Sequence, residues 1–212
     1  MRNISKKISL WNRTRKYKYF EHKIGFTSET TVLDVGFMNH EGNYEAANYL
    51  EKHYPYPQNI TALGIGKKDV FCRKYPLVRT VLYDGENFPF EDKSFGIGWS
   101  NAVIEHVMGG GAAQLHFLKE LLRTCRVVCF TTPNKYFPIE LHTQFPFLHW
   151  LPKRVYDKIL IRLGRHKQTS QYINLLTKKR IIKLCREAGA KKVTIKGNRF
   201  FGFVMDYIII IE

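Results

Sequence analysis

The sequence lacks the features of a disulfide-rich or membrane-spanning protein. Its 212 residues include four cysteines, and no two of them have C-x-x-C spacing. The longest purely aliphatic run, Ile208 to Ile211, is far shorter than the ~18 apolar residues that cross a bilayer. The basic N-terminus has no apolar segment and no small-residue cleavage site after it. We therefore expect no disulfide or zinc framework, no metal site, no secretory signal and a cytoplasmic location.

Acidic residues are also scarce. The chain has 18 Asp and Glu against 34 Lys and Arg, which gives a formal charge of +16. The excess lies in residues 1–24, with eight basic residues against one Glu, and in residues 153–199, with fifteen against two acids. These segments are either a solvated surface or a contact for an anionic partner: a phosphorylated substrate, an anionic lipid surface or nucleic acid.

Residues 1–24 are expected to form a basic N-terminal arm or helix. Ile4, Ile8 and Trp11 have the i, i+4, i+7 spacing of an amphipathic helix. Such a helix either covers a ligand pocket or makes peripheral contact with the inner surface of a membrane.

Hydrophobic patterning predicts alternating strands and helices. Short apolar runs predict seven strands, at residues 31–35, 60–65, 78–83, 95–100, 126–132, 192–196 and 205–211. Helical patterns lie at residues 43–53, 112–124 and 177–188, with Asn43 and Thr177 as N-caps and Gly189 as the C-terminal cap. Cys125 and Cys129 share one strand face and are expected to be buried thiols. The alternation indicates an α/β fold, a doubly wound and mainly parallel sheet with helices on both faces.

Ligands of such sheets bind beyond the carboxyl ends of the strands, where the strand order reverses. The residues expected there are Gly36, Gly66, Asp84-Gly85, Ser100-Asn101 and Asn134. Glycines let a ligand approach the backbone, a carboxylate accepts hydrogen bonds, and the first strand-to-helix turn offers free N–H groups. A nucleoside-type cofactor suits this set.

The sequence resembles the class I methyltransferases that use S-adenosylmethionine, specifically the type 11 group. Val32–Gly36 (VLDVG) is similar to the family's first-strand motif. Tyr83–Val107 (YDGENFPFEDKSFGIGWSNAVIEHV) is similar to its third-strand, turn and fourth-strand motif, and is the most specific stretch. The resemblance implies a Rossmann-like seven-stranded sheet, mostly parallel with an antiparallel C-terminal strand, in one methyltransferase-like domain over residues 25–212.

The resemblance also implies a set of residues that bind S-adenosylmethionine. Asp84 would face the adenine amine, Gly85 the adenine ring and Gly36 the methionine end. Ser100 and Asn101 would line the methionine side. The complete expected set is Asp34, Gly36, Phe37, Gly66, Asp84, Gly85, Ser100 and Asn101.

The chain departs from the family pattern in two places that concern the cofactor. Met38 and His40 stand where the family has two further glycines. Gly66 stands where the second strand of the family ends in an acid that binds the ribose hydroxyls. A missing ribose contact costs about 1–3 kcal/mol, or a ten- to hundred-fold loss of affinity.

Residues 133–176 form an aromatic-rich insert, interpreted as an acceptor site or lid, or else as a satellite core under a long loop. An acceptor O–H or N–H needs a general base of suitable pKa. The catalytic candidates are His106, which follows the fourth strand, and Glu140 and His142 in the insert. His106 has the alternative role of a packed residue in a turn.

These observations favour an S-adenosylmethionine-dependent methyltransferase that acts on a small-molecule, lipid- or sugar-linked acceptor, with no obligate protein partner. Two alternatives stay open. One is a methyltransferase-like fold that has lost its cofactor and acts as a binding or scaffold protein, because of Met38, His40 and Gly66. The other is a methyltransferase acting on RNA, because of the basic residues 153–199. Nucleic acid is the less favoured partner, since no RNA-binding module is visible.

Overall fold

The computed structural model describes residues 2–42, 44–140 and 142–212. The chain divides into two compact units. The first comprises Met1–Asn101 and Leu121–Cys129, and the second comprises Ala102–Glu120 and Phe130–Glu212. Helix α4 (Gly110–Thr124) and strand β5 (Cys125–Pro133) each pass from one unit into the other.

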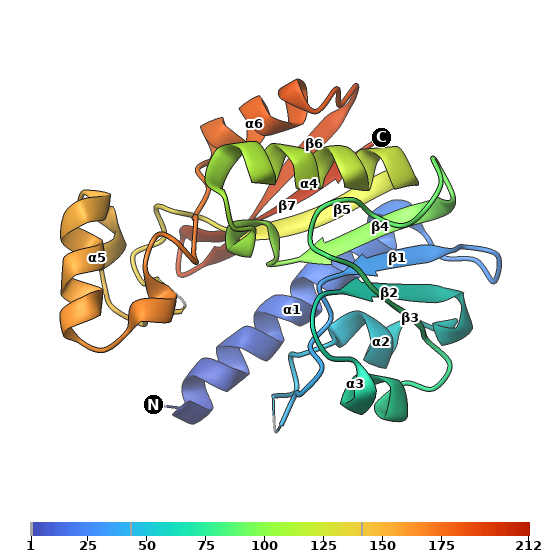
Figure 1. The fold of residues 1–212 in the computed structure, drawn as a ribbon, viewed down its shortest axis with the longest axis horizontal. Coiled ribbons are helices and arrows are strands. Elements are labelled where there is room, and N and C mark those ends of the chain that lie inside the picture. The colour runs from blue at the N-terminus through green and yellow to red at the C-terminus, as the bar shows by residue number, and fades with distance from the viewer. Residues whose placement is uncertain (1, 43, 141) are drawn as a thin grey trace. The chain divides into compact units, whose positions relative to one another are not determined.

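The strands form a seven-stranded sheet in the order β3-β2-β1-β4-β5-β7-β6 (Figure 1). In the first unit β1 pairs in parallel with β2 and β4, and β2 pairs in parallel with β3. The bounds of these strands are β1 Val32–Val35, β2 Ile60–Gly64, β3 Arg79–Leu82 and β4 Phe95–Asn101. In the second unit β6 (Val193–Phe200) and β7 (Phe203–Ile211) are antiparallel. The predicted fold class is confirmed, and the order reverses between β1 and β4, inside the first unit.

Strands β1 and β2 are buried in the sheet, because apolar residues cover both of their faces. Every residue of β1 and β2 is buried. Gly98 of β4 makes room for a core thiol, since a Cβ at this position would lie 2.7 Å from Sγ of Cys125. Cys125 and Cys129 are both fully buried, as the sequence predicted.

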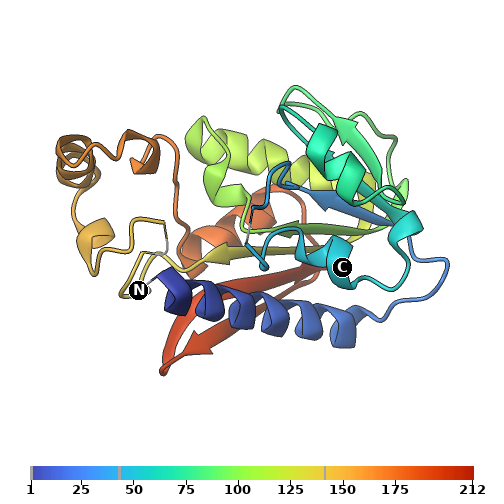
Figure 2. The same cartoon turned by 90° about the horizontal axis from the view of Figure 1, so that it is seen from below.

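Helix α1 (Arg2–Ile24) packs through aromatic side chains of its C-terminal half. Its buried side chains include Tyr17 and Phe20. The ring of Phe20 lies 4.4 Å, centroid to centroid, from that of Trp99 in β4. Trp11 is exposed under the guanidinium of Arg15. Ile8 is half-buried and the Ile4 side chain lies outside the described residues, so the two roles expected for this stripe stay predictions; α1 itself is one unbroken helix (Figure 2).

Two helices of the first unit differ from the prediction. The helix expected over residues 43–53 is only α2, Tyr49–His53, and the expected cap Asn43 lies outside the described residues. Asn48 has a left-handed backbone (φ 43°) that interrupts the helical pattern. Helix α3 (Asp69–Lys74) was not predicted. Its first turn is capped from a distance, because Oδ1 of Asn39 accepts hydrogen bonds from the N–H groups of Val70 and Phe71, both at 3.0 Å.

In the second unit α6 (Lys178–Glu187) begins as predicted, since the Thr177 hydroxyl accepts from the N–H of Arg180. Gly189 has a φ of 84°, which suits the predicted cap. The C-terminal hairpin is longer than predicted, and the 133–176 insert contains helix α5 (Lys153–Arg162). Helix α5 stands apart from α4 and α6 in both ribbon views (Figures 1 and 2). Among the helices of the described residues, none has the length and apolar character needed to cross a bilayer.

Candidate functional site

Three glycines with left-handed backbones follow the first three strands of the first unit. Gly36, Gly66 and Gly85 have φ values of 106°, 85° and 95°, which side chains rarely allow. A Cβ on Gly66 would meet nothing within 4 Å, and one on Gly85 would meet only Cγ2 of Ile65, at 3.9 Å. We call this edge, made of Gly36, Ile65, Gly66, Asp84 and Gly85, the strand-end rim. Its bare, open backbone leaves room for a flat ligand.

The strand-end rim also carries an apolar side chain and a carboxylate. Ile65 is 66% exposed, beside Gly85. Asp84 is exposed, and its Oδ1 accepts a hydrogen bond from the N–H of Glu86 at 2.8 Å, which fixes the side chain in a local turn. An exposed isoleucine offers an apolar surface to a ring, and the second carboxylate oxygen of Asp84 is able to accept a hydrogen bond.

Other residues predicted to bind the cofactor have structural partners. The Asp34 carboxyl is buried beside Glu51 of α2, and burial and the charge of Glu51 raise the pKa of Asp34. The Phe37 ring packs on Phe71, with centroids 4.4 Å apart. The Ser100 hydroxyl donates to the Val35 carbonyl at 3.2 Å. Asn101 ends β4.

The loop after β1 is fixed by side chains that sequence reasoning missed. The N–H of Met38 donates to Oδ1 of Asn48 at 2.7 Å, and Nδ2 of Asn48 donates back to the Met38 carbonyl at 2.8 Å. Glu41 forms ion pairs with Lys52 and Lys74, at 2.8 and 2.6 Å. Burial by itself would raise the pKa of Glu41, but hydrogen bonds, first from these two lysines, lower it to about 2. Met38 thus stands in a braced loop where the family pattern has a glycine.

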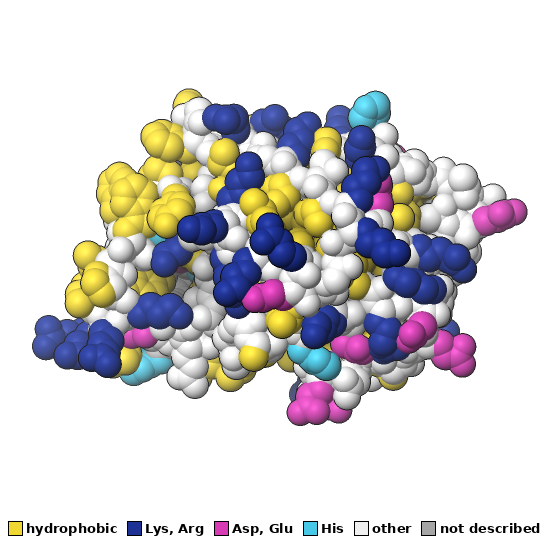
Figure 3. Space-filling model, turned by 90° about the horizontal axis from the view of Figure 1, so that it is seen from above, with side chains coloured by type: hydrophobic (Ala, Val, Ile, Leu, Met, Phe, Trp, Pro, Cys, Tyr) yellow, Lys and Arg dark blue, Asp and Glu magenta, His cyan; other side chains and the backbone are white. Residues whose placement is uncertain are grey.

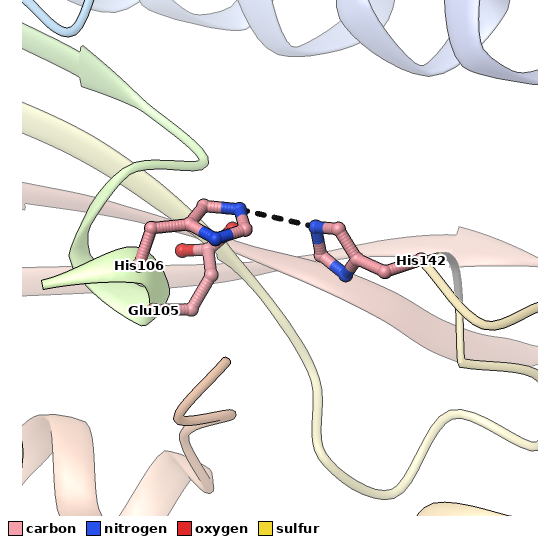
Figure 4. Close-up of side chains that lie close together, drawn as sticks. All are labelled: Glu105, His106 and His142. Atoms are coloured by element: carbon pink, nitrogen blue, oxygen red, sulfur yellow. Dashed lines mark hydrogen bonds between the residues drawn. The ribbon is translucent and has the colours of Figure 1, made fainter. Parts of the chain in front are cut away.

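The second unit brings together the three predicted catalytic residues. His106 belongs to the turn Ile104–His106, and Glu140 and His142 lie in the loop after β5. Nε2 of His106 lies 3.1 Å from Nε2 of His142, and Nδ1 of His142 lies 2.6 Å from Oε1 of Glu140. Figure 4 shows the two rings facing each other, with Glu105 beside them. We call Glu105, His106, Glu140 and His142 the histidine cluster.

Glu140 is a buried carboxylate at the base of this cluster. It accepts hydrogen bonds from the His142 ring and from the N–H groups of His142 and Thr143, at 3.0 and 2.5 Å. Burial would raise the pKa of Glu140, but these bonds outweigh it and lower the pKa to about 2. Glu140 is therefore charged at neutral pH.

The two imidazoles have opposite pKa shifts. Burial alone would lower the pKa of His142, but the hydrogen bond to Glu140 and the charges of Glu140, Glu105 and Asp206 raise it. Partial burial and the neighbouring His142 ring lower the pKa of His106. A proton shared by the pair therefore resides on His142, and His106 accepts from it.

Buried polar side chains hold the turn that carries Glu105 and His106. Nε2 of Gln114 donates to the carbonyls of Ile104 and Asn174, at 3.0 and 3.2 Å. The N–H of Asn174 donates to the Glu105 carbonyl at 2.7 Å, and the Thr132 hydroxyl donates to Oε2 of Glu105 at 3.0 Å. Sequence reasoning missed these residues, because their partners are 10 to 69 positions away in the chain; only the Glu-His pair after a strand hinted at them.

Residues 33–127 match the family model described as "Methyltransferase domain". No curated protein matches the sequence. Among solved structures, the chain is similar to the CurJ carbon methyltransferase (TM-score 0.56, 12% identity), covering 94% of this chain and 53% of that one. It therefore spans about half the length of that structure.

Two other solved structures match over most of both chains. One is a SAM-dependent methyltransferase from Aquifex aeolicus (TM-score 0.54, 14% identity), covering 92% of this chain and 88% of that one. The other is a SAM-dependent methyltransferase, possible histamine N-methyltransferase, from Thermotoga maritima (TM-score 0.56, 14% identity), covering 98% and 91%. At these identities the likeness shows a shared fold. The chain thus has the class I methyltransferase fold and matches a methyltransferase domain over residues 33–127.

Proposed function

We propose that the protein transfers a methyl group from S-adenosylmethionine to an oxygen or nitrogen of a small acceptor carried on a lipid or sugar. The observation that carries the proposal is the histidine cluster, in which a buried carboxylate orients one imidazole toward a second, exposed one. Such a pair is suited to take a proton from an acceptor O–H or N–H.

The strand-end rim fits the adenosine part of the donor. Asp84 offers a carboxylate oxygen to an amine, and Ile65 and the backbone of Gly85 lie side by side as an exposed surface for a ring. Gly66 supplies no carboxylate for the ribose hydroxyls, so these hydroxyls would hydrogen-bond to backbone groups and to water. When bound, S-adenosylmethionine supplies an electrophilic sulfonium methyl group.

The histidine cluster is expected to manage the acceptor's proton. In its neutral form, an imidazole Nε2 accepts the proton that leaves the acceptor heteroatom. The proton then lies between His106 and His142, and the Glu140 carboxylate stabilises the resulting positive charge at 2.6 Å from Nδ1 of His142. Asn101 of β4 and Glu105 are four positions apart in the sequence, so one short segment leads from the donor-side residues to this cluster.

A lipid-linked acceptor is supported by the surface of the insert. Large hydrophobic side chains that are exposed there are Tyr136, Ile139, Phe147, Trp150, Leu151, Val155, Ile161 and Leu163. Basic side chains alternate with them at Lys153, Arg154, Lys158 and Arg162. Figure 3 looks onto α6 from above. It shows Lys and Arg side chains over the face of α6, and hydrophobic side chains gathered toward the end where α5 lies. Aromatic and basic side chains together suit the interface of an anionic membrane.

The test has a binding arm and a transfer arm. Isothermal titration measures the affinity for S-adenosylmethionine and S-adenosylhomocysteine. Transfer of a labelled methyl group is then measured to sugar-linked lipids in phosphatidylglycerol vesicles, to the free sugars and to RNA.

We expect binding of the donor and transfer to the vesicle-borne acceptors. Absence of donor binding at millimolar concentration would overturn the proposed activity and favour a scaffold role. Transfer to RNA alone, with a steep salt dependence, would overturn the proposed acceptor class while keeping the reaction.

A further inference from the structure

The histidine cluster brings three ligand-type side chains to one point. Glu105, His106 and His142 each offer a ligand atom, and these atoms all lie within 4.8 Å of one another (Figure 4). Glu105 and His106 come from the turn after β4, and His142 comes from the loop after β5. All three belong to the second unit. We propose that Glu105, His106 and His142 bind a divalent transition-metal ion.

The hydrogen bonds of the two rings favour a cation between them. Nδ1 of His142 is held by the Glu140 carboxylate at 2.6 Å, so in the neutral ring Nδ1 carries the proton and Nε2 carries the lone pair. Nε2 of His142 lies 3.1 Å from Nε2 of His106, and two imidazole nitrogens this close need a proton or a metal ion between them. A bound metal ion would take the place of the shared proton.

The separation of the two nitrogens suits a common ion. Imidazole nitrogens lie about 2.0–2.1 Å from Zn²⁺, so two of them on one ion are about 2.9 Å apart at a right angle and about 3.4 Å apart in a tetrahedron. The observed 3.1 Å lies between these values. The carboxylate of Glu105 completes the set by a side-chain shift of about 1–2 Å from the present spread of the ligand atoms.

The surroundings also favour a cation. The Thr132 hydroxyl donates to Oε2 of Glu105 at 3.0 Å, which orients the carboxylate. Glu140 orients His142 in the same way, and such outer partners are typical of metal sites. The charges that act on His142 come from Glu140, Glu105 and Asp206, so a strongly basic protein is locally acidic here. His106 is exposed, which gives the ion a route from solvent.

Two imidazoles and one carboxylate favour Zn²⁺, Mn²⁺ or Fe²⁺ and leave coordination positions open. An acceptor oxygen bound at an open position would lose its proton to solvent water more readily, because the ion stabilises the alkoxide. The ion would then replace the two imidazoles, whose Nε2 atoms bind it, as the group that activates the acceptor. This consequence rests on the proposed methyl transfer, but ion binding itself does not.

The experiment measures metal binding without donor or acceptor. Protein stripped with EDTA and dialysed is titrated calorimetrically with Zn²⁺ and Mn²⁺, and with Co²⁺ as a spectroscopic probe. We expect one ion per chain at micromolar or tighter Kd, and visible Co²⁺ bands that indicate nitrogen ligation. His106→Ala and His142→Ala each weaken binding at least about 100-fold, and Glu140→Gln weakens it by about 10- to 100-fold.

The matched control is His116→Ala, because His116 is an exposed histidine of α4 outside the cluster. Thermal melting of each variant establishes that it is folded; His106 is exposed, so its removal leaves the core intact. Millimolar or weaker binding by the wild type, or equal losses in His116→Ala and His106→Ala, would overturn the site. Titration of S-adenosylmethionine into the same metal-free protein tests the proposed function separately. Failure of the metal site and failure of the proposed function are therefore distinguishable.

Discussion

The strand-end rim and the histidine cluster achieve their geometry by opposite means. The rim of the first unit consists of glycine backbone, one exposed isoleucine and one exposed carboxylate. The histidine cluster of the second unit consists of side chains held by hydrogen bonds, from another segment for Glu105, His106 and His142 and from its own loop for Glu140. Shape is thus set by absent side chains in one region, and by charged and polar side chains in the other.

The difference matters for how each region responds to change. A rim made of backbone tolerates the loss of one contact, because the others remain. In the histidine cluster, Glu140 raises the pKa of His142, and His142 in turn contacts His106. Removal of any one of these side chains therefore disturbs the other two.

The largest expected effect is in the histidine cluster. His142→Ala is expected to lower kcat for methyl transfer by about 10²–10⁴-fold, because the proton acceptor is lost, and to leave donor affinity unchanged. Single-turnover transfer and calorimetric titration measure the two quantities. His116→Ala is the control with unchanged kcat. An equal loss of donor affinity in His142→Ala would show that the two regions are not separate in function.

The second-largest effect is expected on stability, at Glu41 in the loop between β1 and α2. The pKa of Glu41 in the folded protein, about 2, lies below the ordinary value of 4.5 for this side chain. Its stabilisation is therefore complete above pH 4.5 and is lost as the pH falls toward 2. Glu41→Gln is expected to lower the free energy of unfolding by about 2–3 kcal/mol at pH 7, and by roughly 40% of that at pH 3.

Urea unfolding at both pH values measures this difference. Glu45→Gln is the control, because Glu45 is exposed on the same segment and its removal is expected to change stability by less than about 0.5 kcal/mol. A Glu41→Gln defect of equal size at pH 3 and pH 7 would contradict the ion-pair explanation.

A third, smaller effect is expected at the rim. Asp84→Ala removes one acceptor for the donor's amine and is expected to weaken S-adenosylmethionine binding by about ten- to hundred-fold. The KM of the acceptor stays the same. Calorimetric titration beside Glu86→Ala, an exposed acid two positions along, measures the effect. Equal affinities in the two variants would remove Asp84 from the site.

The smallest effect is expected on donor affinity when a side chain is added to the strand-end rim at Gly66. Gly66 has open space around it, so Gly66→Asp places a carboxylate near the ribose position and is expected to tighten donor binding several-fold. Its φ of 85° strains any side chain, at a cost of about 1 kcal/mol in stability. Gly66→Ala has the same strain and no carboxylate. Identical donor affinity in both variants would show that the ribose does not lie beside Gly66.

Sequence reasoning predicted the sheet because its signals are local. The apolar runs of β1 and β2 and the cap at Thr177 depend on neighbouring residues, and the structure confirms them. It missed α3, whose cap comes from Asn39, about thirty positions away. It also did not foresee that polar Asn12 and Lys16 of α1 are buried among its core residues.

The candidate site shows the same division. Gly36, Gly66 and Gly85 were found from strand-end positions, and the structure gives all three left-handed backbones. His106 and His142 were proposed separately as catalytic candidates. Their pairing at 3.1 Å depends on a contact across 36 positions of sequence, which no local pattern encodes.

The cap at α3 has a consequence for how the first unit moves. Oδ1 of Asn39 holds the amide protons of both Val70 and Phe71, so these protons exchange with solvent only when the loop after β1 swings away. The rate of their deuterium uptake therefore reports how often the loop opens. A ligand that binds against the loop slows exchange at both amides together, and Asn39→Ala speeds exchange at both by removing their acceptor.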